Sequence, residues 1–146
     1  MMQIEDKRNV VIFNGITLPV YESNGYRYFM AGIPTDELAR DEDTQPREYN
    51  EKSAKKIAQS IDRKVIMQPI LTRYSEKGQV TEGVKKHVLI VEGQHRCRAE
   101  RDFRHSEYIP AIVYLDMNLH LAQQCGLEAN ETDRARGLSG GAFAKK

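Results

Sequence analysis

The pattern of apolar and polar residues changes character near residue 50. Before that point, short apolar runs are separated by turn-forming Asn-Gly pairs. The runs cover residues 10–13, 16–21 and 26–30. Such runs joined by Asn-Gly turns are typical of antiparallel strands. The sequence therefore predicts a β meander over residues 9–30, a short segment around Leu38, and a polar loop over residues 40–44.

Helices and strands alternate from residue 50 onward. Four apolar residues with helical spacing predict a helix over residues 51–62, namely Ala54, Ile57, Ala58 and Ile61. Apolar runs predict strands over residues 70–74, 88–91 and 109–115, a polar hairpin lies over residues 75–86, and helices are expected over residues 94–104 and 118–130. The wholly apolar run 88–91 is typical of a strand covered on both faces. The predicted class is α/β or α+β, with a small mixed sheet.

Composition narrows the class of protein. Of the 146 residues, 40% are hydrophobic and 29% are charged, as in an ordinary globular domain. There is no apolar stretch of the roughly 18 residues that a membrane helix needs. The first residues are acidic where a signal peptide is basic, so we expect a cytoplasmic protein. Cys97 and Cys125 lack the spacing of a zinc site or of a disulfide framework.

The candidate chemistry lies where the apolar run 88–91 meets the predicted helix over residues 94–104. Gly93 permits a sharp turn, and the N–H groups at a helix start favour an anion. His95 and Arg96 would add side-chain donors, and Arg96 could bind a phosphate at two points. A plain turn with basic surface residues shows the same pattern. A net charge of only +1 makes any polyanion contact local.

Four segments, taken together and in order, resemble a known family. They are Gln45-Pro46-Arg47-Glu48-Tyr49-Asn50, Ile57-Ala58-Gln59-Ser60-Ile61, Met67-Gln68-Pro69-Ile70-Leu71-Thr72-Arg73 and Glu92-Gly93-Gln94-His95-Arg96-Cys97-Arg98-Ala99. The first three resemble motifs of the amino-terminal domain of ParB partition proteins. The fourth resembles both the ParB box and that of the sulfiredoxins, which share the fold. The resemblance covers about residues 33–134, which leaves residues 1–32 as an added β extension and residues 135–146 as a flexible tail.

The resemblance implies a nucleotide site and assigns roles by position. The implied phosphate- or nucleotide-binding residues are Gln45, Arg47, Gly93, Gln94, His95, Arg96, Arg98 and Arg134. Mg²⁺ with CTP or ATP is the implied ligand, and Glu128 and Asn130, in a loosened version of a later ParB box, are the implied metal ligands. The implied catalytic residues are Glu92, His95 and Arg96.

Two departures from these families change the expectation. Sulfiredoxins have their reactive cysteine at the position of Gln94, and glutamine offers no thiolate, so repair of oxidised cysteine is not expected. We interpret Cys97 as a small packing residue. The resemblance also does not extend to the helix-turn-helix domain with which full partition proteins read DNA sequence.

Three functions remain open at this point. The preferred one is a ParB-like nucleoside triphosphate-binding protein, with slow Mg²⁺-dependent CTPase or ATPase activity, from a plasmid, phage or other mobile element. The second is a metal-dependent DNA nuclease in which Glu92 and Glu128 hold the metal. The third is a non-catalytic regulator or adaptor that binds DNA, or a plasmid-transfer or partition protein. A homodimer or a mobile-element protein is a further expected partner, and no membrane is.

Overall fold

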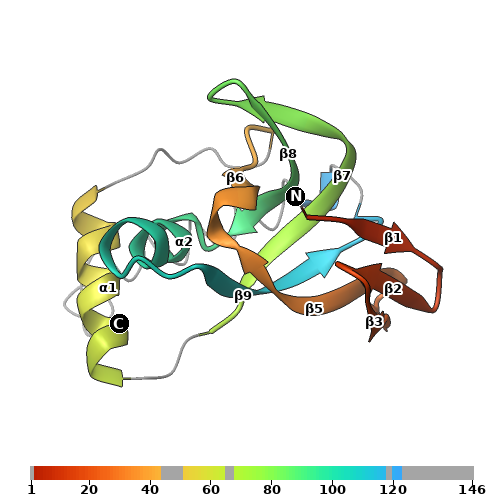
Figure 1. Ribbon diagram of the computed structural model, residues 1–146, viewed down its shortest axis with the longest axis horizontal. Coiled ribbons are helices and arrows are strands. Elements are labelled where there is room, and N and C mark those ends of the chain that lie inside the picture. The colour runs from red at the N-terminus through yellow and green to blue at the C-terminus, as the bar shows by residue number, and fades with distance from the viewer. Residues whose placement is uncertain (1, 44–50, 65–67, 118–119, 123–146) are drawn as a thin grey trace, which may run out of the picture.

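The computed structural model describes residues 2–43, 51–64, 68–117 and 120–122 (Figure 1). Its strands are β1 (Ile4–Asp6), β2 (Val10–Phe13), β3 (Ile16–Pro19), β4 (Tyr21–Ser23), β5 (Tyr26–Pro34), β6 (Leu38–Arg40), β7 (Ile70–Thr81), β8 (Val84–Glu92) and β9 (Tyr108–Tyr114). Its helices are the 3₁₀ turn η1 (Thr35–Glu37), α1 (Glu51–Lys64), α2 (Gln94–Arg98) and the π-helix η2 (Ala99–Phe103).

The main sheet is mixed and has six strands in the order β4-β5-β9-β7-β8-β6. The pairs β7–β9 and β6–β8 are parallel, and the other neighbours are antiparallel. Strand β8 lies between β7 and β6, and its residues 88–91 are all buried. The predicted mixed-sheet class and the interior strand over residues 88–91 are therefore confirmed. Figure 1 shows α1 and α2 side by side at one end of the molecule and the small sheet of β1, β2 and β3 at the other.

The core joins the two sheets. Most of its largest fully buried side chains come from the six-stranded sheet, among them Phe29, Ile33, Ile70, Val88, Ile109 and Val113. Val11 and Phe13 of the small sheet belong to the same cluster, and the ring of Phe13 lies 6.0 Å from that of Phe29. The N-terminal strands therefore share the hydrophobic core of the main sheet.

The side chain of Arg27, on β5, connects the N-terminal strands to the end of β9. The guanidinium of Arg27, on β5, donates to both carboxylate oxygens of Asp6 at 3.0 and 2.8 Å and to the carbonyl of Arg8 at 2.9 Å. Its Nε donates to Asp116, just after β9, at 2.9 Å. This arrangement holds the pKa of the Asp6 carboxyl below its ordinary value.

Two local expectations were wrong. The predicted strand over residues 16–21 is broken at Val20, because β3 pairs within the small sheet whereas β4 pairs with β5. The predicted polar loop over residues 40–44 begins inside β6, and Asp41 is fully buried. The predicted helix over residues 94–104 is confirmed through Phe103, and it changes from an α-helix to a π-helix after Arg98.

The polar segment over residues 75–86 is strand on both sides of its tip, so the predicted hairpin has longer arms than expected. Of the predicted helix over residues 118–130, residues 120–122 are described and are helical. Within the described part of the chain, no helix combines the length and the apolar character that crossing a membrane requires.

Candidate functional site

The turn between β8 and α2 requires glycine. Gly93 has φ 107° and ψ 21°, in the left-handed region that L side chains rarely adopt. A Cβ atom added there would lie 2.4 Å from Cγ2 and 2.8 Å from Cβ of Ile70, the first residue of β7. The absence of a side chain therefore allows β7 to pass directly beneath the start of the helix.

The helix begins immediately after this turn. The Cys97 N–H donates to the Gly93 carbonyl at 2.9 Å, which closes the first helical turn. The N–H groups of Gln94, His95 and Arg96 precede that bond and have no acceptor within the helix itself. His95 and Arg96 are half-buried at this end, and Glu92 is exposed. The arrangement presents a positive helix end with an imidazole and a guanidinium beside it, a donor set that suits phosphate oxygens.

Arg96 connects the turn to the segment before β7. Its Nη1 donates to the carbonyl of Gln68 at 2.8 Å and to that of Pro69 at 3.4 Å. The Gln-Pro pair and the Gly93 box, 25 residues apart in sequence, therefore meet at one side chain. The sequence analysis had assigned Arg47, and not the Gln68-Pro69 pair, to the site at the Gly93 turn.

The predicted phosphate-binding residues of α2 do not all share one face. Gln94 and Arg98 line a cleft between the helix and the β7–β8 hairpin, whereas Arg96 contacts the segment before β7. Residues four apart in a helix share a face, and a residue midway between them points away. The candidate residues are thus divided between two sides of the same helix.

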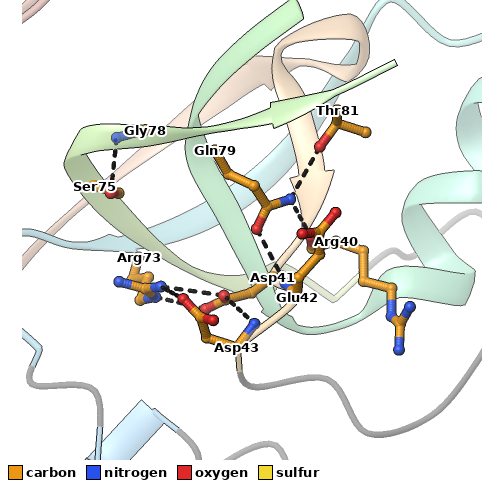
Figure 2. Close-up of polar contacts among 9 residues, drawn as sticks. All are labelled: Arg40, Asp41, Glu42, Asp43, Arg73, Ser75, Gly78, Gln79 and Thr81. Carbon is orange, nitrogen blue, oxygen red and sulfur yellow. Dashed lines mark hydrogen bonds and ion pairs between the residues drawn. The ribbon is translucent and has the colours of Figure 1, made fainter. Parts of the chain in front are cut away.

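A buried ion pair anchors the chain just before the predicted Gln45-Pro46-Arg47 motif (Figure 2). Asp41, which follows β6, is fully buried and accepts from Nε and Nη2 of Arg73 at 2.5 and 3.1 Å. The Asp41 backbone N–H donates to the Ile90 carbonyl at 3.2 Å, and the Asp43 N–H donates to the Asp41 carboxylate at 3.1 Å. The sequence analysis did not single out either member of the pair.

Gln79 of β7 supports the same segment (Figure 2). Its Oε1 accepts from the Glu42 N–H at 3.0 Å, while its Nε2 donates to the Arg40 carbonyl at 2.8 Å and to the Thr81 hydroxyl at 2.9 Å. The long hairpin therefore curls over β6 and fixes the path of residues 40–43.

The remaining predicted site residues lie outside the described residues. They are Gln45, Arg47, Glu128, Asn130 and Arg134. Among the described residues there is no group of three His, Cys, Asp or Glu side chains placed to hold a metal ion. Glu92 is the carboxylate next to the turn, so Mg²⁺ stays a prediction that depends on Glu128 and Asn130.

Cys97 is expected to be inert towards thiol reagents. It is 3% exposed, and burial raises the pKa of its thiol to about 11. At pH 8 its thiolate fraction should be about one hundredth of that of an unfolded thiol. Iodoacetamide should therefore label Cys97 only after urea unfolding, and peptide mass spectrometry separates it from Cys125. Equal labelling rates in the native and unfolded protein would contradict the packing role.

Comparison with known proteins tests the family resemblance that the sequence indicated. The sequence profile described as ParB N-terminal domain matches residues 24–128. No curated protein sequence is significantly similar to the chain.

Two solved structures of ParB from Caulobacter crescentus are similar. The C-terminally truncated chromosome-partitioning protein ParB complexed with CTP-gamma-S has a TM-score of 0.54 and 28% identity, over 69% of this chain and 52% of that one. Its complex with the centromeric parS site has a TM-score of 0.53 and 23% identity, over 68% of this chain and 46% of that one, and shows the fold alone. The chain thus spans about half the length of these truncated proteins. With the profile covering most of its length, the predicted resemblance is confirmed: the chain belongs to the ParB N-terminal domain family.

Proposed function

We propose that this protein binds a nucleoside triphosphate, with the phosphates at the Gly93 turn on the side of Arg96. The observation that carries the proposal is the meeting of the left-handed glycine, the helix start and the Arg96 guanidinium at the Gln68-Pro69 carbonyls. A helix start offers N–H donors and a partial positive charge, and the guanidinium adds charge-assisted hydrogen bonds to phosphate oxygens.

The similarity to a ParB structure that holds a CTP analogue supports the same assignment. It favours CTP as the first nucleotide to test. His95 would be a further phosphate donor, and Arg47 would be the donor from the Gln-Pro-Arg segment. In this proposal the buried pair of Asp41 and Arg73 fixes the chain just before that segment.

The proposal extends to hydrolysis of the bound nucleotide and to the cellular role of the protein. Slow hydrolysis would require donors that stabilise the charge developing on the terminal phosphate, and His95 and Arg96 are the candidates among the described residues. Glu92, exposed beside the turn, is the candidate general base. Mg²⁺, when bound through Glu128 and Asn130, would neutralise phosphate charge. We further propose a partition-related role on a mobile element, with DNA or a partition protein as partner.

Replacing Arg96 tests the nucleotide site. Isothermal titration with CTP, ATP, GTP and UTP, with and without Mg²⁺, should show binding of at least one nucleotide to the wild type. Arg96→Ala should weaken that binding about tenfold or more, because it removes charge-assisted hydrogen bonds to phosphate. Lys77→Ala, which removes an exposed cation of the hairpin, is the matched control and should leave the affinity unchanged.

The proposal fails if no nucleotide binds the folded wild-type chain, or if Arg96→Ala binds as tightly as Lys77→Ala. Circular dichroism of each variant separates lost binding from lost folding. Phosphate release with and without Mg²⁺, compared between wild type and Glu92→Gln, then tests turnover separately from binding.

A further inference from the structure

Strand β9 and the part of β5 from residue 28 onward are apolar on both faces. The two strands pair side by side, so residues opposite each other, such as Tyr28 and Tyr114, have their side chains on the same face of the sheet (Figure 1). The odd-numbered residues, among them Phe29 and Val113, belong to the buried core. The even-numbered residues lie on the opposite face. Strands that are apolar on both faces are typical of sheets covered on both, so the opposite face lacks the cover that its sequence favours.

The residues of this opposite face form one continuous surface, which we call the strip. It consists of residues 28, 30, 32 and 34 of β5, residues 108, 110, 112 and 114 of β9, and Tyr21 of β4, which pairs with Tyr28. All of them are Tyr, Met, Ile, Pro or Gly, so none carries a charge at neutral pH. The rings of Tyr21, Tyr28 and Tyr114 lie in a row across three strands, with centroids 5.6 and 5.2 Å apart.

Much of the strip is open to solvent. The side chains of Tyr21, Met30 and Tyr108 are 44%, 51% and 59% exposed. These three residues alone present on the order of 300 Å² of surface, to which their half-buried neighbours add. Monomeric proteins rarely expose larger apolar patches, and such patches mark interaction sites. The strip is large enough for a specific contact and small enough that the contact would be weak.

The composition of the strip favours a second copy of this chain as its partner. A nucleic acid would need cations, and the strip has none. Interfaces between identical chains are more apolar than transient contacts between different proteins, and interface centres are rich in Tyr and Met and poor in charge. Two identical uncharged strips can also meet face to face without repulsion between like charges. Twofold contact of this kind is the commonest way in which identical chains associate.

We propose that two copies of this chain associate through their strips, as a weak twofold dimer that forms without nucleotide. In the dimer, Tyr21, Met30 and Tyr108 of each copy lose their contact with water, and the row of tyrosines supplies aromatic contacts. The proposal does not depend on the proposed nucleotide site, because the strip and the Gly93 turn share no residue.

Sedimentation equilibrium of the full chain without nucleotide, from about 10 µM to about 1 mM, covers the range expected of a weak interface. The mass of the wild type should rise from that of a 16.7 kDa monomer and approach twice that mass. Met30→Glu should raise the dissociation constant about tenfold or more, because each copy brings the new charge into the interface. Val80→Glu is the matched control and should leave the dissociation constant unchanged. It places the same carboxylate at another exposed apolar position of a strand, outside the strip.

Gly32→Glu gives a second test at the centre of the strip. A Cβ at Gly32 would lie 3.7 Å from Tyr108 Cβ, an ordinary contact, so the variant should fold, which circular dichroism checks. It should weaken the dimer as strongly as Met30→Glu. The proposal is overturned if the wild type stays monomeric at the highest concentration, or if Val80→Glu weakens association as much as Met30→Glu. A mass that grows beyond that of a dimer would also overturn it, because the strip would then dock on a different surface of the next copy.

Discussion

Gly93→Ala should destabilise the protein by about 2–5 kcal/mol. A Cβ at this position would lie 2.4 Å from Ile70 Cγ2, and relieving that overlap typically costs about 1–3 kcal/mol. Holding a non-glycine residue at φ 107° adds roughly 1–2 kcal/mol. Urea denaturation should show the loss, and the melting temperature should fall by on the order of 10 °C.

Gly83→Ala separates the two causes. Gly83, at the tip of the hairpin, has φ +78°, yet a Cβ there would have no neighbour within 4 Å. Only the conformational cost remains, so its loss should be roughly 1–2 kcal/mol. If the two variants lose equal stability, Ile70 does not press against the turn, and the close passage of β7 beneath the helix start is wrong.

Asp41→Ala should cost about 3–5 kcal/mol, the usual effect of leaving one member of a buried ion pair alone. Asp41 is fully buried, and only 15% of the Arg73 side chain is exposed. The carboxylate also accepts the Asp43 N–H, so the path of the chain before residue 44 loses its anchor. Denaturant titration measures the stability, and nucleotide titration measures the effect on the proposed site.

Two control variants test whether the stability loss of Asp41→Ala comes from leaving Arg73 buried without the Asp41 carboxylate. Asp41→Leu/Arg73→Met removes both charges and should recover most of the stability, since apolar replacements of a buried pair are often neutral. Glu5→Ala breaks the exposed pair of Glu5 with Lys7 and should leave the stability almost unchanged, because solvent screens both charges. A loss for Asp41→Ala as small as that for Glu5→Ala would show that solvent, or Asp43 at 3.7 Å, compensates the charge of Arg73, and would contradict the anchoring role of Asp41.

The sequence predicted those parts of the fold that have local patterns. The run over residues 88–91 identified the interior strand because it is apolar on both faces, and helical spacing identified α1. Strand β6 has only three residues, and its pairing comes from β8, about fifty positions later, so no local pattern marks it. Asp41 looked like a loop residue because its partner Arg73 is 32 positions away.

The sequence likewise predicted the parts of the candidate site that depend on a local pattern and missed the parts that depend on distant segments. The glycine turn and Arg96 followed from the junction of a strand with a helix, and the structure places both there. The division of Arg96 from Gln94 and Arg98 could not be predicted, because it depends on which neighbours pack against each side of the helix. The cleft beside α2 was missed for the same reason, since its lining comes from separate elements and its wall is a hairpin that bends over β6.

The position of Arg27 should make the unfolding of the two sheets cooperative. Asp6 near the start of the chain and Asp116 after the last strand of the sheet are both held by this one guanidinium. Separation of the small sheet (β1 to β3) from the main sheet would therefore also break the bond of Arg27 to Asp116, which follows β9. We expect the two sheets to unfold in a single cooperative transition. Acid should weaken the ion pair of Asp6 with Arg27, because folding lowers the pKa of the Asp6 carboxyl. The contribution of this ion pair to the free energy of unfolding is complete above the pKa of the unfolded carboxyl. It is lost as the pH falls through the lower pKa of the folded state.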